Sequence, residues 1–204
     1  MHGESIDWVM INTVKKALSY PSGEEHNGKE IKHYLQYKFD KELDTQPIFK
    51  RVLDLGSLDV NGTIRNYKFL RENYPLWRDL INCKEYVGID LIEGPSVDRV
   101  MSSNDLKFED NSFDLILSLS ALEHDIDPQK TIKEAFRVLK PGGIFLIVCP
   151  NKDVPPHTDL GGGSKEVYNI ITLKMLKEWI IDSGFTINSL IPTYCDYLVN
   201  ATKK

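Results

Sequence analysis

Residues 51–62 (RVLDLGSLDVNG) constrain the fold more than any other part of this chain. They form a short apolar strand that ends in Asp54, followed by a tight turn that contains Gly56. At the carboxyl edge of a parallel sheet, such a turn presents backbone N–H groups beside a carboxylate. This arrangement predicts a site for a nucleotide-type cofactor. An acid at one strand end more often only caps its turn, so the prediction depends on the pattern of the later strands.

Further strand and helix patterns occur at distances typical of an α/β protein. Residues 86–90 (YVGID) repeat the pattern of an apolar strand that ends in an acid, and residues 112–120 form another apolar strand. Residues 98–101 are a short strand candidate between them. The run at 143–149 has the continuous apolar character of a strand buried on both faces of a parallel sheet. We therefore expect alternating strands and helices in a single layer of mostly parallel strands.

Helix boundaries are marked by their usual end signals. Asp127 and Pro128 predict a helix start, with Asp as the cap and Pro in the first turn, and residues 140–143 (KPGG) predict its end. Helices are also expected at residues 63–73 and 172–183, the latter closed by Gly184. Because Arg137 and Lys140 lie near the end of their helix, we expect both cations to interact with its C-terminus.

The two ends of the chain have distinct patterns. Apolar residues at helical spacing predict a helix over residues 6–19, and a second helix is expected over 29–39. Both precede the first strand, so they are candidates for a lid over the site or for helices that pack on the sheet. At the other end, residues 185–191 and 194–200 are two strands joined too closely for a helical crossover, which predicts an antiparallel pair.

Composition excludes several functional classes. The chain has 204 residues and a net charge of −5, which suits one globular domain and gives no basic footprint for duplex nucleic acid. Its three cysteines are widely spaced and no secretory signal precedes them, so we expect a cytoplasmic protein. The longest apolar run is far shorter than the ~20 residues of a membrane-spanning helix, and no membrane partner is expected.

The order of these motifs resembles that of class I S-adenosylmethionine-dependent methyltransferases, especially the small-molecule branch that includes the ubiquinone and menaquinone biosynthesis enzymes. The resemblance covers residues 51–150 and returns in the last helix and strand pair. Its most specific part is residues 108–150, where F-x-D-x-S-F-D, L-E-H and R-V-L-K-P-G-G occur in the family's order.

The resemblance implies a Rossmann-like α/β three-layer sandwich with a seven-stranded, mostly parallel sheet. The implied strand order is 3-2-1-4-5-7-6, with the last strand antiparallel. We expect residues 1–204 to form a single methyltransferase domain, with 1–45 as a helical lid segment and 46–204 as the cofactor-binding core.

The glycine turn favours S-adenosylmethionine over a dinucleotide. A pyrophosphate needs the close approach of G-x-G-x-x-G, and here only Gly56 and Gly62 are present. S-adenosylmethionine has no phosphate. The turn also departs from the family's G-x-G-x-G, which leaves the contacts of Ser57, Asp59 and Asn61 open.

Each part of S-adenosylmethionine has candidate ligands. Asp54, Gly56 and Ser57 are expected at its amino-acid end, and by resemblance Asp90 would accept both ribose hydroxyls. Leu91 and Ile92 are candidates for an apolar wall against the adenine. The cofactor-binding set is completed by Asn104 or Asp105 near the adenine amine, by Ser120, and by His124.

Methyl transfer from a sulfonium needs an oriented acceptor and, for a hydroxyl or ammonium, a proton acceptor. The candidate catalytic bases are His124, after the strand at 112–120, and His157 in the loop at 151–166, since imidazole titrates near neutrality. In the family, the Glu123-His124 pair commonly lines the sulfur end instead, and His157 can equally be a solvated loop residue. Asp125 and Tyr168 are further candidates. No metal is required, and the histidines show no metal-ligand spacing.

These observations predict methyl transfer from S-adenosylmethionine to an oxygen or nitrogen atom of a small-molecule acceptor, with S-adenosylhomocysteine as product. The acceptor pocket is expected between the N-terminal helices and residues 151–168. The alternative is a non-catalytic cofactor-binding or partner subunit with the same fold, favoured by the altered glycine turn. A nicotinamide-dependent oxidoreductase is disfavoured by the missing glycines. The sequence leaves monomer and homodimer open.

Overall fold

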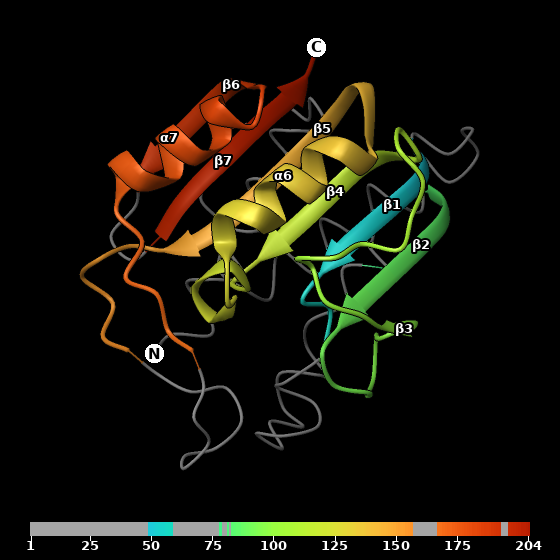
Figure 1. The fold of residues 1–204 in the computed structure, drawn as a ribbon, viewed down its shortest axis with the longest axis horizontal. Helices are drawn as coiled ribbons and strands as arrows, with labels where there is room; N and C mark the ends of the chain where they lie inside the picture. The colour runs from blue at the N-terminus through green and yellow to red at the C-terminus, as the bar shows by residue number, and fades with distance from the viewer. Residues whose placement is uncertain (1–48, 59–77, 79–80, 82, 157–166, 193–195) are drawn as a thin grey trace, which may run out of the picture.

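A computed structural model describes residues 49–58, 78, 81, 83–156, 167–192 and 196–204. Its centre is one seven-stranded sheet in the order β3-β2-β1-β4-β5-β7-β6 (Figure 1). β7 runs antiparallel to both of its neighbours, whereas the pairs formed by β1 to β5 are parallel. The predicted strand order and the antiparallel last strand are confirmed. The strands are β1 (Phe49–Leu55), β2 (Cys83–Asp90), β3 (Arg99–Val100), β4 (Phe113–Leu119), β5 (Leu139–Pro150), β6 (Phe185–Pro192) and β7 (Asp196–Lys203).

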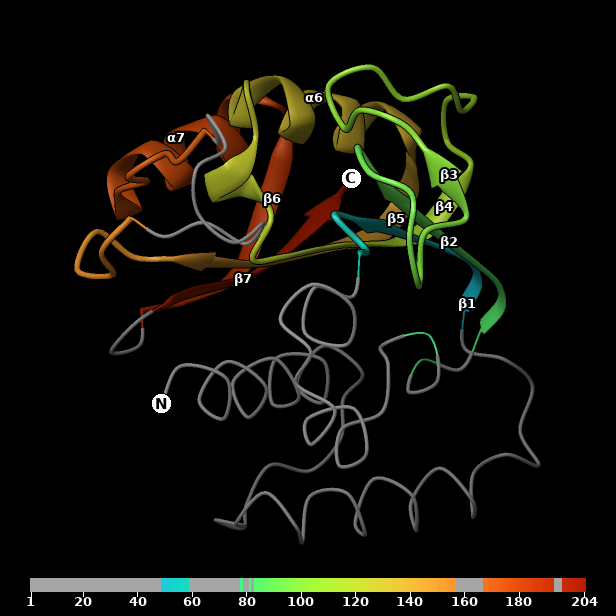
Figure 2. The same cartoon turned by 90° about the horizontal axis from the view of Figure 1, so that it is seen from below.

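Two helices lie on the same face of the sheet, α6 (Pro128–Val138) and α7 (Leu173–Asp182) (Figure 2). Ile132, Ala135 and Leu176 from these helices are completely buried against the strands. Side chains alternate along β1, so Leu53 belongs to the core beneath the helices and Val52 to the core of the opposite face. The central strands are buried on both faces, as their continuous apolar sequence predicts.

The helix ends agree with the sequence signals. Asp127 caps α6 by accepting a hydrogen bond from the Lys130 N–H at 3.1 Å, and Thr172 caps α7 in the same way through the Met175 N–H at 3.2 Å. β5 differs from the prediction because it begins at Leu139, not at residue 143. Residues 140–143 form a bulge within the strand, between the pairs Phe113–Leu139 and Leu115–Ile144.

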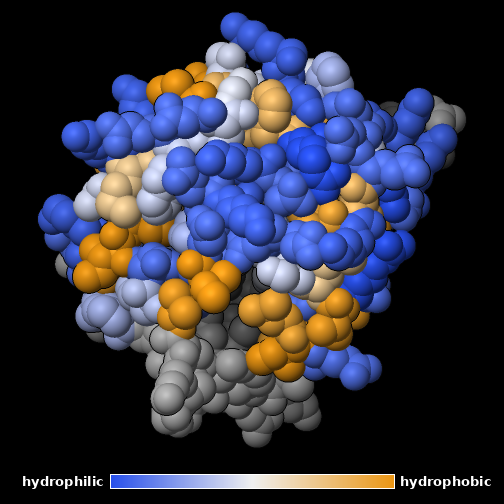
Figure 3. Space-filling model, in the orientation of Figure 1, coloured by the Kyte–Doolittle hydropathy of each residue, from blue (hydrophilic) through white to orange (hydrophobic). Residues whose placement is uncertain are grey.

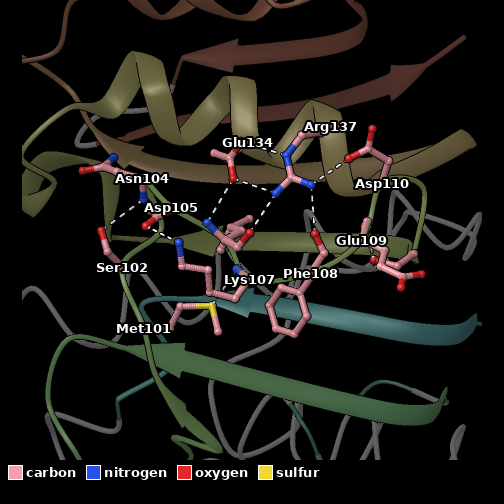
Figure 4. Close-up of polar contacts among 12 residues, drawn as sticks. Met101, Ser102, Asn104, Asp105, Lys107, Phe108, Glu109, Asp110, Glu134 and Arg137 are labelled. Carbon is pink, nitrogen blue, oxygen red and sulfur yellow. Dashed lines mark hydrogen bonds and ion pairs between the residues drawn. The ribbon is translucent and has the colours of Figure 1, made fainter.

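Arg137 lies in the last turn of α6, as predicted, but it also makes contacts that the sequence did not indicate. Its guanidinium pairs with Glu134 and Asp110 and donates to the carbonyls of Leu106 and Phe108 at 2.8 and 2.9 Å (Figure 4). Arg137 thereby fixes the β3–β4 connection to α6.

Lys140, the other cation predicted for this helix end, instead pairs with Asp114 at 2.8 Å. A second cation at the end of α6 is Lys203 of β7. It donates to the Phe136 carbonyl at 2.7 Å and lies 3.3 Å from the Arg137 carbonyl. A residue at the far end of the chain thus adds a second positive charge at this helix end.

Several predictions lie outside the described residues. These are the helices at 6–19, 29–39 and 63–73, the lid at 1–45, and residues 157–166 of the loop at 151–166. In the part of the chain that is described, no helix is long and apolar enough to cross a membrane.

Candidate functional site

The predicted site residues from β1 lie where the strand turns away from the sheet. Gly56 has φ +76°, and the N–H groups of Gly56 and Ser57 both bind the Ile89 carbonyl of β2, at 2.9 and 3.0 Å. A Cβ atom on Gly56 would lie 2.5 Å from the Cβ of Ala121. The turn therefore needs glycine for its backbone conformation and for its close approach to the segment after β4.

Asp54 is a buried carboxyl group near the end of β1. Its Oδ2 accepts a hydrogen bond from the Tyr86 hydroxyl at 2.8 Å. Burial raises the Asp54 pKa to about 7, although the Tyr86 hydrogen bond and the charge of Arg78 both favour the ionised form. At neutral pH this acid is poised between its two protonation states, which suits a group that meets a cation.

Replacing Asp54 by asparagine is expected to stabilise the ligand-free protein more at high pH than at low pH. The folded-state pKa of about 7 exceeds the ordinary value of 3.8, so wild-type stability falls as pH rises between these values. Between pH 5 and pH 8, the stability difference between Asp54→Asn and wild type should grow by about 2 kcal/mol. Urea unfolding at both pH values measures it, with the exposed Asp182→Asn as control. A pH-independent difference would contradict the raised pKa.

Asp90 ends β2 beside the β1 turn. Its Oδ2 accepts from the Leu58 N–H and its Oδ1 from the Ile92 N–H, both at 3.2 Å. These bonds hold the carboxylate at the carboxyl edge of the sheet, next to Gly56. Leu91 is 67% exposed and Ile92 is 41% exposed, so both present apolar surface at this edge. Their placement is compatible with the ribose and adenine roles, which stay predictions.

The sequence analysis did not predict the contacts by which the β2–β3 loop stabilises this edge of the sheet. The Asp98 carboxylate accepts from the Gly88 N–H at 2.7 Å and from Arg78 at 2.6 Å. A Cβ on Gly88 would lie 2.1 Å from the Ser96 carbonyl, which also accepts the Ser57 hydroxyl at 2.9 Å. The glycine of the YVGID motif therefore allows the β2–β3 loop to close over β2. The motif signalled a strand, but not this close approach.

The adenine candidates lie in different environments. Asn104 is buried, and its amide nitrogen lies 2.8, 2.9 and 2.7 Å from Asp125 Oδ1, the Asp127 carbonyl and Thr131 Oγ1. Asp105 is exposed and pairs with Lys107 at 2.5 Å (Figure 4). Neither placement tests contact with an adenine. Asn104 ties its segment to the start of α6, whereas the Asp105 carboxylate faces solvent.

Asp125 is the centre of this connection. It accepts from the hydroxyls of Ser103 and Thr131 at 2.7 and 2.6 Å, and from Asn104 and the Asp127 N–H at 2.8 and 2.9 Å. A carboxylate with four hydrogen bonds from the protein is best suited to organising the loop. We therefore prefer the histidine over Asp125 as a proton acceptor.

The segment after β4 carries the other predicted residues. Ser120 has φ +54°, a conformation that a non-glycine residue rarely adopts, and its N–H donates to the Val148 carbonyl at 2.8 Å. The short 3-10 helix η1 (Leu122–His124) comes directly after it. The structure thus brings Ser120 and His124 to the same edge as Gly56, since Ala121 contacts the glycine turn.

His124 packs edge-to-face against Tyr168, with 5.4 Å between ring centroids. Next to it, the Asn169 side chain donates to the Asp125 carbonyl at 2.7 Å, and its backbone N–H donates to the Glu123 carbonyl at 2.7 Å. The segment before α7 therefore fixes the position of η1. Asn169 had no signal in the sequence, because it lies 44 residues from Asp125. His157 lies outside the described residues.

Buried acids extend this edge toward β7. Glu123 and Asp196 are each 1% exposed, and the Cys149 thiol of β5, between β4 and β7, is fully buried. Burial, and then the charges of Glu123 and Asp196, raise the Cys149 pKa well above its ordinary value. This thiol stays protonated at neutral pH and is not a nucleophile. In the described part of the chain, no cluster of His, Cys, Asp and Glu is arranged to hold a metal ion.

The described surface is largely polar on the face that carries the helices. Figure 3 shows polar side chains over most of the face that carries the helices, and apolar groups toward the lower side of the view. The exposed large apolar residues of the described chain are Leu91, Ile92, Val100, Ile126, Val167, Ile170 and Ile181.

Comparisons with known proteins agree with this geometry. The family model described as "Methyltransferase domain" matches residues 76–147. The chain is 30% identical over 111 residues to the ubiquinone/menaquinone biosynthesis C-methyltransferase of Vibrio cholerae, covering 52% of this chain and 43% of that protein. It is 26% identical over 110 residues to the ubiquinone biosynthesis O-methyltransferase of Parvibaculum lavamentivorans, covering 48% and 44%.

A solved structure of an S-adenosylmethionine-dependent methyltransferase from Mesorhizobium loti has the same fold. Its TM-score is 0.53 at 19% identity, covering 83% of this chain and 98% of that one. The predicted resemblance and fold are therefore confirmed. The chain spans less than half the length of the curated relatives it matches.

Proposed function

We propose that this chain, which carries a methyltransferase domain on the fold of S-adenosylmethionine-dependent methyltransferases, transfers a methyl group to an oxygen or nitrogen atom of a small acceptor. The observation that carries the proposal is one juxtaposition. Asp54, the Gly56 turn, Asp90 and η1 come from separate parts of the chain and meet at the carboxyl edge of β1, β2 and β4. Ligands of open α/β sheets bind at this edge.

The groups at this edge fit the chemistry of S-adenosylmethionine. The Asp90 carboxylate would accept the two ribose hydroxyls, and the exposed Leu91 and Ile92 side chains would cover the adenine. Asp54 would meet the α-ammonium, and the Gly56 turn, which packs closely against Ala121, would lie beside the amino-acid end. When bound, the cofactor supplies a methyl group on a positively charged sulfur. Nothing in this donor set calls for a phosphate-bearing ligand.

The protein's own part in the reaction is to orient the acceptor, exclude water and remove a proton. His124 ends η1 at this edge and is our candidate to take the proton from an acceptor hydroxyl or ammonium. Tyr168 and Asn169 hold η1 in place from the segment before α7. The matched relatives include both an O-methyltransferase and a C-methyltransferase by name, so our choice of oxygen or nitrogen rests on His124 as base.

Calorimetry with S-adenosylhomocysteine and S-adenosylmethionine tests the cofactor site. We expect micromolar binding to wild type and at least about 30-fold weaker binding to Asp90→Ala, because two hydrogen bonds to a charged group are lost. Asp182→Asn, at the exposed end of α7, is the matched acidic control and should bind as wild type does. Absence of binding to wild type would overturn the proposal.

Transfer itself is tested with S-adenosylmethionine labelled in the methyl group, incubated with a panel of phenols, carboxylic acids and amines. Labelled product that forms with wild type and is lost when His124 is replaced supports an oxygen or nitrogen acceptor. A product with a new carbon–methyl bond would overturn that assignment while retaining the enzyme.

The second candidate is a subunit that binds the cofactor or a partner without catalysis. It is favoured by the turn G-S-L-D-V-N-G, which departs from the glycine pattern usual in the family. Tight cofactor binding with no labelled product across the panel would favour this candidate. For its partners, we propose a small-molecule acceptor and not nucleic acid. We propose that the chain is either a monomer or a homodimer.

A further inference from the structure

We propose that Tyr86 is a positioning residue for the amino-acid end of the cofactor: its hydroxyl orients Asp54 so that the remaining carboxyl oxygen receives the α-ammonium. The inference rests on the proposed function, since it assumes that S-adenosylmethionine binds at this edge.

The strand register explains why only Tyr86 reaches this carboxyl group from the neighbouring strands. Asp54 lies opposite Gly88 on β2 and opposite Leu117 on β4. Gly88 has no side chain and Leu117 is apolar, so neither neighbour can hydrogen-bond the carboxyl group. Tyr86, two residues before Gly88, points along the same face and donates to Asp54 Oδ2 at 2.8 Å.

The other oxygen, Oδ1, accepts no hydrogen bond from the residues that the structure describes. Oδ1 is not among the fully buried polar atoms that lack a partner in the described part of the chain, so it stays accessible, and a ligand ammonium would add a charge-assisted hydrogen bond to it. One oxygen held by the protein and one left for the ligand is the arrangement expected of an ammonium receptor.

Charged neighbours influence whether Asp54 is protonated or ionised. Arg78 stacks over the Tyr86 ring at 5.2 Å, and Asp90 lies at the end of the same strand. The Arg78 charge favours the ionised form of Asp54, whereas the Asp90 charge disfavours it. Tyr86 has its own pKa raised well above 10 by burial and then by Asp54, so it remains a hydrogen-bond donor throughout the physiological range.

Two ligands distinguish a role of Tyr86 in binding the amino-acid end from a general effect of Tyr86 on the cofactor site. S-adenosylhomocysteine carries the α-ammonium, whereas 5′-methylthioadenosine shares its adenosine and sulfur but lacks the amino-acid end. In calorimetry, Tyr86→Phe should weaken S-adenosylhomocysteine about 10-fold and leave 5′-methylthioadenosine within about 2-fold of wild type. Tyr197→Phe removes the same atom from another buried tyrosine of the sheet and should change neither ligand. Equal weakening of both ligands by Tyr86→Phe, or of neither, would overturn the proposal.

The pH profile gives a second readout that needs only S-adenosylhomocysteine. Its affinity for wild type should rise with pH as Asp54 ionises near pH 7. The Tyr86 hydrogen bond favours ionisation, so Tyr86→Phe should move this rise to higher pH. Asp54→Asn should abolish the rise, and adding Tyr86→Phe to it should have no further effect. An unmoved profile in Tyr86→Phe would refute the positioning role, whereas failure of wild type to bind would instead refute the proposed function.

Discussion

Replacing Arg137 by methionine is expected to lower the free energy of unfolding by about 2 kcal/mol, because a half-buried guanidinium that makes several charge-assisted hydrogen bonds is lost. The change leaves the Glu134 carboxylate without its bidentate partner and removes the donors to the Leu106 and Phe108 carbonyls. Arg137 also holds the pKa of Glu134 below its ordinary value through these hydrogen bonds. Urea unfolding at neutral pH measures the loss.

A matched control is the ion pair of Lys140 with Asp114, which lies at the start of the bulge in β5. Lys140→Met removes one partially exposed pair and should cost about 1 kcal/mol or less. Arg137→Lys keeps the charge but not the forked geometry, so it should fall between the two. If Arg137→Met is no more destabilising than Lys140→Met, the Arg137 contacts contribute little to stability.

The same variant has a consequence for the site. Arg137 fixes the β3–β4 connection, which carries Asn104 and Asp105 (Figure 4). If either residue contacts the adenine, Arg137→Met should weaken cofactor binding even at temperatures where the protein stays folded.

Gly56→Ala is expected to destabilise the protein by roughly 2 to 4 kcal/mol and to weaken cofactor binding at least about 10-fold. Part of the cost is the left-handed backbone at φ +76°, about 1 kcal/mol. The rest arises because the new methyl group would lie 2.5 Å from Ala121 Cβ, and overpacking costs about 1 to 3 kcal/mol. Displacing Ala121 would also shift Ser120 and η1 at the site.

Gly142 provides a control that distinguishes the cost of the left-handed backbone from the cost of the steric contact. Its φ of +79° is nearly the same, but a Cβ there would meet nothing within 4 Å. Gly142→Ala should therefore show the backbone cost alone and leave binding unchanged. Adding Ala121→Gly to Gly56→Ala should recover most of the steric part, as thermal unfolding and calorimetry would show. Equal destabilisation by Gly56→Ala and Gly142→Ala would mean that the contact with Ala121 is relaxed at no cost.

Local sequence signals were sufficient for the helix starts and for the closing hairpin, whereas the strand order came from the family resemblance. Asp127 with Pro128 marked the start of α6, and the closing hairpin was evident from two strands with no room for a crossover. They were less reliable where a strand passes through irregular backbone. The bulge at residues 140–143 has the sequence of a loop, because proline and glycine are rare inside regular strands, yet β5 continues through it.

The candidate site was predicted in part. The acids at the ends of β1 and β2 and the segment after β4 meet at one edge, since parallel strands bring their carboxyl ends together. The position of a residue relative to a strand end did not reveal the roles of the neighbouring residues. Asp125 appeared as a possible base and proves to hold four hydrogen bonds, and Arg137 appeared as a helix-end charge and proves also to hold a loop.

The sequence by itself therefore determined the strands, the helix caps, the closing hairpin and the acids at the strand ends, because each depends on residues within a few positions of one another. Only the tertiary structure decided which side chains become partners. Tyr86 meets Asp54 across 32 residues, and Arg137 meets the Leu106 carbonyl across 31. Such contacts depend on strand register and helix placement, and the short-range periodicity of the sequence predicts neither.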